Sequence, residues 1–159
     1  PQNEVPEKTK GYEGFYMLTS ISGEVDEAKL SYILRDFDLD GLNQRKAKIE
    51  EIAKILQQKY GEDRIIVEIK DSYYNMKEKI EPVMYIIDLA KKAMKDADIE
   101  PKIVPIRGGT DGARISYMGI PTPNLFTGGY NFHGYYEYAV AEEMEKAKEV
   151  IINIVKNNK

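Results

Sequence analysis

The chain has 159 residues, of which 42% are hydrophobic and 31% are charged, and this length fits one domain or two small ones. Its 23 basic and 27 acidic side chains give a formal net charge of −4, which argues against a general nucleic-acid binder. The sequence contains no cysteine and a single histidine, His133. A disulfide scaffold, a thiolate metal site and a cysteine nucleophile are therefore excluded. A metal site that needs several imidazoles cannot be completed by this chain alone.

The first residues are polar and prone to turns. The stretch PQNEVPEKTKGYEGF has no initiator Met and none of the basic and apolar regions of a signal peptide. No run approaches the roughly 20 apolar residues of a membrane span, so we expect no membrane partner. This composition predicts that the chain was cut from a longer one, with tag removal or Met processing as the alternative. The absence of cysteine is compatible with a reducing cytoplasm.

A β-hairpin is predicted first. Aromatic and β-branched residues from Tyr12 to Ile21 indicate a strand, which a turn at Ser22-Gly23 would end. The next segment alternates between apolar and polar residues, and this period of two predicts a hairpin with one buried face. The apolar positions of that segment are Ala28, Leu30, Tyr32 and Leu34.

A helix and a short strand are predicted to follow the hairpin. The helix would be capped by Asp38 or Asp40 and would end at Gly61, where a left-handed backbone costs least. One apolar stripe runs along it, formed by Ile49, Ile52, Ala53, Leu56 and Tyr60. Residues 64–69, with the sequence RIIVEI, predict a strand.

The second half alternates between predicted helices and strands, as a piece of an α/β sheet does. One amphipathic helix spans 80–97 with Pro82 near its first turn. A last helix, beginning near Glu142, carries an apolar stripe formed by Met144, Ala147, Ile151, Ile154 and Val155. Strands are predicted over 102–106 and 121–127. The fold class is therefore mixed α/β, and the change of pattern predicts two partial domains, residues 1–74 and 75–159.

The stretch from Ile106 to Gly112 is the most informative candidate site. Arg107 ends a predicted strand, and Gly109 leads into a short helix that Thr110 or Asp111 would cap. A guanidinium beside free backbone N–H groups suits a carboxylate or a phosphate. The glycine spacing matches neither a P-loop nor a dinucleotide fingerprint. The alternative is a plain strand-to-helix turn with an exposed arginine.

Two further stretches contain candidate residues. Gly129 and His133 follow a predicted strand at its carboxyl end, where open α/β sheets bind ligands. His133 is either a metal ligand, whose partners would lie outside this chain, or a hydrogen-bonded structural residue. Asn75, in the tyrosine-containing segment 71–76, would either line a cleft or decorate a loop.

Several motifs, in one consistent order, resemble the peptidase T family. They are PEKTKGYEGFYML, LSYILRDFD, DSYYNM and RGGTDGARISYMGIPTPNLFTGG followed by YNFHG. The resemblance covers essentially the whole chain and implies a cytoplasmic two-zinc aminopeptidase that removes the N-terminal residue of tripeptides. Residues 1–74 would then be part of a two-layer lid domain with a hairpin, a helix and a strand. Residues 75–159 would be the C-terminal part of the α/β catalytic domain.

The resemblance also implies roles for single residues. His133 matches the family's last zinc ligand, and Arg107 with Asn75 matches positions expected to hold the C-terminal carboxylate of the substrate. The substrate site would further include Gly109, Thr110 and Gly129. The remaining zinc ligands, the bridging carboxylate and the general-base glutamate have no counterpart here, so the chain contains no catalytic residue and is expected to be inactive alone. A homodimer through the lid hairpin is a further implied partnership.

A second interpretation belongs to another class of function. A non-catalytic α/β module that binds small anions, or that dimerises through its hairpin, would explain the single histidine without a longer chain. A long upstream reading frame rich in His, Asp and Glu would favour the peptidase. A natural start at Pro1 would favour the module.

Overall fold

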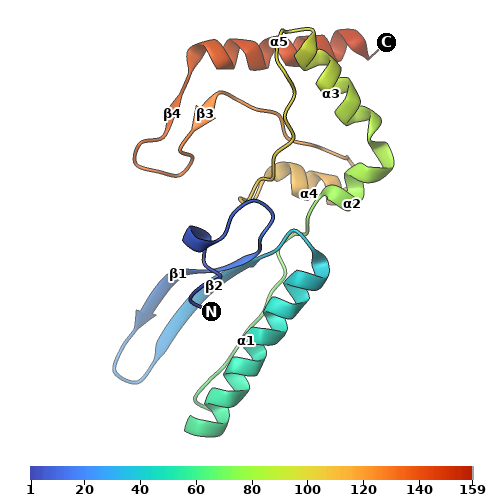
Figure 1. The fold of residues 1–159 in the computed structure, drawn as a ribbon. Helices are drawn as coiled ribbons and strands as arrows, with labels where there is room; N and C mark the ends of the chain where they lie inside the picture. Colours follow the sequence, from blue (N-terminus) through green and yellow to red (C-terminus); the bar gives the residue numbers. More distant parts are fainter. Residues whose placement is uncertain (159) are drawn as a thin grey trace. The chain divides into compact units, whose positions relative to one another are not determined.

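The computed structural model describes residues 1–158. The chain divides into two compact units, a first unit of Pro1–Asn75 with Pro105–Gly108 and a second unit of Met76–Val104 with Gly109–Lys159. Each unit combines helices with a two-stranded antiparallel sheet (Figure 1). The mixed α/β class expected from the sequence is thereby confirmed. The assignment of these regions to a lid and a catalytic domain stays a prediction.

The sheet of the first unit is a hairpin of β1 (Phe15–Gly23) and β2 (Ala28–Arg35) (Figure 1). It follows a short 3-10 helix, η1 (Pro6–Lys8). The chain reverses at residues 24–27, where the Glu24 N–H donates to the Glu27 carbonyl (2.7 Å). The turn predicted at Ser22-Gly23 is therefore wrong, because both residues continue β1 and pair with β2.

Only the base of this hairpin is buried. Phe15, which pairs with Arg35, is 6% exposed, and Tyr16 is 4% exposed. The Tyr16 ring lies against the guanidinium of Arg45 from the following helix, 5.1 Å from the ring centroid. The outer apolar side chains are exposed, among them Leu18, Ile21, Leu30 and Tyr32. The prediction that one face of the hairpin is buried is wrong for its outer half, because no described part of the first unit covers that half.

Helix α1 (Leu39–Tyr60) begins and ends at the residues that the sequence indicates. Of the two candidate caps, Asp38 is the one used: its side chain accepts a hydrogen bond from the Gly41 N–H (2.9 Å) and satisfies one of the free donors at the helix start. Gly61 ends the helix with a φ of +112°, which glycine adopts without strain. Its N–H donates to the Gln57 carbonyl (2.8 Å).

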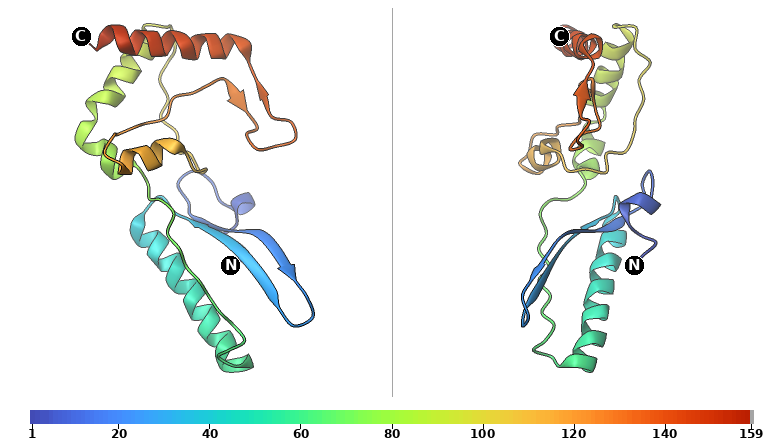
Figure 2. Two further views of the ribbon diagram at one scale, coloured as in Figure 1. Left: turned by 180° about the vertical axis from the view of Figure 1, so that it is seen from behind. Right: turned by 90° about the vertical axis from the view of Figure 1, so that its left-hand side faces the viewer.

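The strand predicted over 64–69 is wrong. The segment is extended but pairs with no strand of the described chain, and it runs back along α1 (Figures 1 and 2). The Gln57 side chain of α1 donates to the Ile65 carbonyl (2.7 Å). A strand pairs only with a neighbouring strand, and here the Gln57 side chain donates to the Ile65 carbonyl instead.

The second unit begins with the predicted helix over 80–97, which is interrupted. It consists of α2 (Lys77–Ile80), the 3-10 turn η2 (Glu81–Val83) and α3 (Tyr85–Lys95). Pro82 lies in η2, since it has no N–H for an α-helical bond and its ring crowds the preceding turn. The helix therefore changes to 3-10 geometry at the proline and resumes after it.

The core of the second unit lies between α3 and α5 (Ala141–Asn157) (Figure 1). Val150 of α5 and Ala93 of α3 are fully buried, and they pack with partly buried apolar side chains that include Leu125, Phe126 and Ile154. The stripe predicted for the last helix is confirmed at Ile154, which packs against this core, and is wrong at Ile151 and Val155, which are exposed. The helix turns Val150, rather than these neighbours, toward α3.

The strands predicted over 102–106 and 121–127 are also wrong, since neither segment pairs with another strand within residues 1–158. The second segment contacts α4 (Asp111–Tyr117) instead. Ser116 of α4 is 2% exposed; its hydroxyl donates to the Gly112 carbonyl (2.7 Å) and accepts from the Thr122 N–H (2.9 Å). The Thr122 N–H, which would bond to a neighbouring strand in a sheet, is therefore bonded to a side chain of α4 instead.

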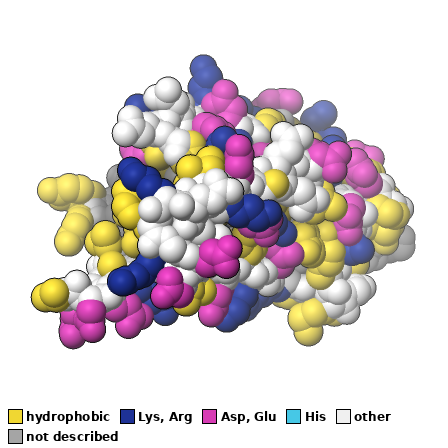
Figure 3. Space-filling view, turned by 90° about the horizontal axis from the view of Figure 1, so that it is seen from below, with side chains coloured by type: hydrophobic (Ala, Val, Ile, Leu, Met, Phe, Trp, Pro, Cys, Tyr) yellow, Lys and Arg dark blue, Asp and Glu magenta, His cyan; other side chains and the backbone are white. Residues whose placement is uncertain are grey.

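The surface carries side chains of both charges and also exposes large apolar side chains. Basic and acidic side chains are interspersed over the face in Figure 3, and several pairs follow helical spacing, such as Lys92 with Asp96 (2.7 Å). None of the helices formed by residues 1–158 is both long enough and apolar enough to cross a membrane.

Candidate functional site

Arg107 is bound to the N-terminal segment of the first unit. Its Nη1 donates to the carbonyls of Thr9 (2.5 Å) and Pro6 (3.4 Å), and its Nη2 donates to the Thr9 hydroxyl (2.5 Å). The guanidinium lies 4.7 Å from the centroid of the Phe15 ring. Its Nε is buried and has no hydrogen-bond partner in the described chain. The predicted carboxylate-binding arginine thus already has protein acceptors on both Nη atoms.

A second arginine lies beside Arg107, and the sequence interpretation did not include it. Arg35, the last residue of β2, donates from Nη1 to the Arg107 carbonyl (2.5 Å). Among residues 1–158, neither arginine forms an ion pair. A guanidinium without a carboxylate partner favours an anion. In the sequence, Arg35 could be singled out as a charged residue at the end of a predicted strand, directly after the apolar run YIL.

The segment that contains Asn75 is bound to the connection between β2 and α1 and to α1 itself. The Asn75 amide donates to the Phe37 carbonyl (3.1 Å), just before α1. Asp71 accepts from the Tyr74 hydroxyl (2.8 Å) and pairs with Lys46 of α1 (2.5 Å). The Lys46 ammonium and then the Tyr74 hydroxyl lower the pKa of Asp71 by hydrogen bonding. These contacts connect the loop to α1 and to the residue before it, and the role of Asn75 at a substrate cleft stays a prediction.

The stretch from Ile106 to Gly112 crosses from one unit to the other. Arg107 belongs to the first unit, whereas Gly109 and Thr110 belong to the second. Thr110 is the residue that precedes α4, as predicted, but its side chain makes no capping hydrogen bond. Its hydroxyl instead accepts from the Asn124 amide (3.2 Å). The threonine therefore connects the start of α4 to the segment that follows the helix.

His133 lies in the loop of a short hairpin in the second unit, between β3 (Gly129–Tyr130) and β4 (Tyr138–Ala139). Its backbone is left-handed, with a φ of +65°, a conformation that few non-glycine residues adopt. Its side chain is exposed, and its imidazole has no hydrogen-bond partner in the described part of the chain.

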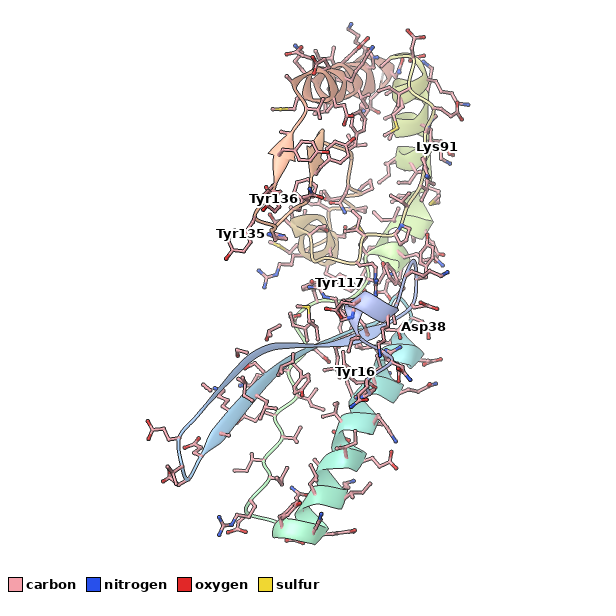
Figure 4. All side chains as sticks on the ribbon, turned by 60° about the vertical axis from the view of Figure 1, so that its left-hand side comes forward. Tyr16, Asp38, Lys91, Tyr117, Tyr135 and Tyr136 are labelled. Atoms are coloured by element: carbon pink, nitrogen blue, oxygen red, sulfur yellow. The ribbon has the colours of Figure 1, made fainter. Side chains whose placement is uncertain are left out.

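The side chains beside His133 are aromatic and exposed. Tyr135 and Tyr136 project from the β3–β4 loop (Figure 4), and Tyr135 is 105% exposed. The tyrosines of the two strands behave differently, since Tyr130 and Tyr138 stack with ring centroids 5.1 Å apart. The tyrosine cluster seen in the sequence thus divides into a stacked pair in the strands and an exposed pair in the loop.

The hairpin is anchored to the start of α5. The Val140 N–H donates to the Gly128 carbonyl (2.8 Å), and the Tyr130 hydroxyl lies 2.8 Å from each carboxylate oxygen of Glu143. Gly128 has a φ of +77°, and a Cβ there would lie 2.9 Å from both the Glu143 Cβ and the Met144 nitrogen. Only glycine permits this close approach, so the base of the His133 loop has a defined position on α5.

The hydrogen bond between Tyr130 and Glu143 predicts a pH dependence. The Glu143 carboxylate accepts from the phenol and, together with burial and charge repulsion, raises the pKa of Tyr130. Because the pKa of Tyr130 is higher in the folded than in the unfolded state, its protonated hydroxyl stabilises the folded state. This contribution to the free energy of unfolding is complete below pH 10.0 and is lost as the pH rises through the folded pKa. Glu143→Gln is expected to lower the pKa of Tyr130 toward its ordinary value, as measured by NMR titration of its ring carbons. Glu142→Gln is the matched control, and an unchanged pKa of Tyr130 in Glu143→Gln contradicts the assignment.

A metal centre cannot be built from the described residues alone. No group of three or more His, Asp or Glu side chains in residues 1–158 is placed to hold a metal ion. His133 fits the requirement for one ligand, since its imidazole is exposed and has no other partner there. Two metal ions need several more ligands, which residues of a longer protein would have to provide.

Proteins named peptidase T are similar to this chain over nearly all of its residues. Over 156 residues the chain is 62% identical to Peptidase T of Geobacillus sp. (strain WCH70), 61% identical to that of Bacillus licheniformis and 62% identical to that of Clostridium perfringens (strain 13 / Type A). Each comparison covers 98% of this chain and 38% of the relative, so the chain spans less than half of the length of these curated relatives. No protein-family model matches the chain. The resemblance to peptidase T that the motifs indicate is confirmed.

Proposed function

We propose that this chain acts within a longer protein as the C-terminal part of a zinc-dependent tripeptide aminopeptidase. The likeness to peptidase T supports the class of reaction. The observation that carries the proposal is the accessible imidazole of His133, presented on a hairpin whose base is anchored to α5 by Gly128 and Tyr130. In this proposal residues 1–74 contribute to the lid and residues 75–159 to the catalytic domain.

His133 is proposed as one zinc ligand. Neutral imidazole is a preferred ligand of zinc, and the defined position of its loop limits the directions in which the ring can point. When bound, a pair of zinc ions supplies a water of lowered pKa and polarises the peptide carbonyl. The general base and the other ligands lie elsewhere in the longer protein.

Arg107 is proposed to bind the C-terminal carboxylate of the peptide, with Arg35 beside it. Neither arginine has a carboxylate partner in the described part of the first unit. A carboxylate matches the geometry of a guanidinium and forms charge-assisted hydrogen bonds with it. Asn75, Gly109, Thr110 and Gly129 are the further proposed substrate residues.

Two broader properties belong to the same proposal. The exposed apolar residues on the outer half of β1 and β2 would pair two copies of the protein through the hairpin, because uncovered apolar strands favour association. The cytoplasm, where peptidases of this kind complete peptide breakdown, is the proposed location.

A comparison of two purified proteins tests the activity. The longer protein is expected to release the N-terminal residue of a tripeptide in the presence of zinc, whereas the 159-residue chain is expected to show no turnover, because one imidazole cannot hold two zinc ions. Released amino acid is quantified for both under one buffer condition, with the assay repeated after chelation. Turnover by the 159-residue chain contradicts the assigned ligand set, and an inactive longer protein contradicts the function.

A non-catalytic anion-binding module remains the second candidate, because the neighbouring Arg35 and Arg107 form no ion pair in the described chain. It predicts that the 159-residue chain binds acetate or phosphate by itself and that the longer protein has no peptidase activity. The tripeptide assay above therefore distinguishes the two candidates directly.

A further inference from the structure

The conformation of His133 needs support from its surroundings. With a φ of +65°, its Cβ approaches a carbonyl oxygen more closely than in extended or helical backbone. Glycine would avoid this strain, but glycine carries no imidazole. A specific interaction must therefore hold this peptide if the imidazole is to have one direction.

That interaction is a hydrogen bond to a side chain four residues later. The His133 N–H donates to Oε2 of Glu137 at 2.7 Å. A bond between a backbone N–H and an ionised carboxylate is stronger than one between neutral groups. In the described chain Glu137 forms no ion pair, so its carboxylate is not drawn toward a basic side chain.

We propose that Glu137 is a positioning residue for His133: its carboxylate holds the His133 peptide in the left-handed conformation and thereby sets the direction of the imidazole. This proposal rests on the proposed role of His133 as a zinc ligand. It adds that Glu137 is the residue that orients this ligand. Glu137 acts on the backbone of His133 and not on its ring, so both ring nitrogens stay available.

The rest of the loop places Glu137 for this role. The Glu137 N–H donates to the Gly134 carbonyl (3.2 Å), and the Gly134 N–H donates to the Asn131 carbonyl (2.9 Å). The Asn131 side chain in turn donates to the Tyr136 carbonyl (3.2 Å). Two successive turns and a side-chain bond thus fold residues 131–137 onto themselves, and they bring the Glu137 carboxylate back to the His133 N–H.

The first test measures the backbone of His133 directly in the longer protein. Glu137→Ala is expected to speed hydrogen exchange of the His133 amide by roughly tenfold, as loss of one charge-assisted bond would. Glu137→Gln keeps an oxygen acceptor and is expected to restore part of the protection. Glu142→Ala, which removes a carboxylate outside the loop, is the matched control and is expected to leave the exchange rate unchanged.

The second test measures zinc affinity in the longer protein by competition with a chelator. Glu137→Ala is expected to weaken zinc binding by about 10- to 100-fold, the range found when a group that supports a metal ligand is removed. Glu137→Gln should lie between Glu137→Ala and the unchanged protein. Circular dichroism of each variant checks that the fold is retained.

The outcomes separate this proposal from the function on which it rests. Unchanged His133 exchange in Glu137→Ala overturns the positioning role. Weaker zinc binding in Glu137→Ala with unchanged His133 exchange assigns Glu137 to the metal itself and overturns the proposal as well. Unchanged zinc affinity in His133→Ala refutes the ligand assignment, and thus the proposed function, whatever Glu137 does to the backbone.

Discussion

Replacing His133 by alanine in the longer protein is expected to abolish zinc binding at one position and to lower tripeptidase activity by at least about two orders of magnitude. Loss of a group that merely supports a metal ligand already costs up to about 100-fold, and loss of the ligand itself removes the activated water as well. Metal content by mass spectrometry and released amino acid are the two measurements.

Two further variants separate the imidazole from the backbone. Alanine is strained at a φ of +65°, whereas asparagine tolerates left-handed backbone. His133→Asn is therefore expected to keep the loop conformation and still lose the metal. Tyr135→Ala, in the same loop and fully exposed, is the matched control and should retain zinc. Zinc content equal to that of the unchanged protein in His133→Asn and His133→Ala contradicts the assignment.

Gly112→Ala is expected to give the largest loss of stability in the second unit, about 2 kcal/mol. A Cβ at Gly112 would lie 2.5 Å from the Thr122 carbonyl oxygen and 2.9 Å from the Asn124 Oδ1. The first of these atoms is backbone, so the segment after α4 must move away from the helix. That movement also breaks the bond between the Thr122 N–H and the buried Ser116 hydroxyl.

The midpoint of urea unfolding measures this loss. Gly108→Ala is the matched control, because its Cβ would have only the Arg35 Nη1 within reach, at 4.0 Å. We expect Gly112→Ala to lower the midpoint clearly and Gly108→Ala to leave it nearly unchanged. Equal midpoints for the two variants would show that the contact between α4 and the segment after it adjusts at no cost.

Local features of the fold follow from local sequence. Asp38 and Gly61 mark the ends of α1 because capping and left-handed backbone depend on a few neighbouring residues. The hairpin of β1 and β2 follows from the alternating pattern across a short turn. The apolar spacing over 80–97 predicts a helix, but not that Pro82 interrupts it between α2 and α3.

The three wrong strands share one physical cause. Segments 64–69, 102–106 and 121–127 have the composition of strands, and a strand exists only when a second one pairs with it. In the first and third segments, side chains of α1 and α4 satisfy backbone groups instead, through Gln57 and Ser116. Composition reports a preference for extended backbone, whereas pairing depends on segments that are distant along the chain.

The sequence by itself determined the mixed α/β class, the ends of α1 and the candidate residues His133 and Arg107, because these depend on residue type and near neighbours. Only the tertiary structure decided what surrounds the candidates. It showed Arg107 bound to Thr9 and adjacent to Arg35, and it showed the His133 peptide held by Glu137. Such contacts arise when the chain folds back on itself, and spacing along the sequence does not specify them.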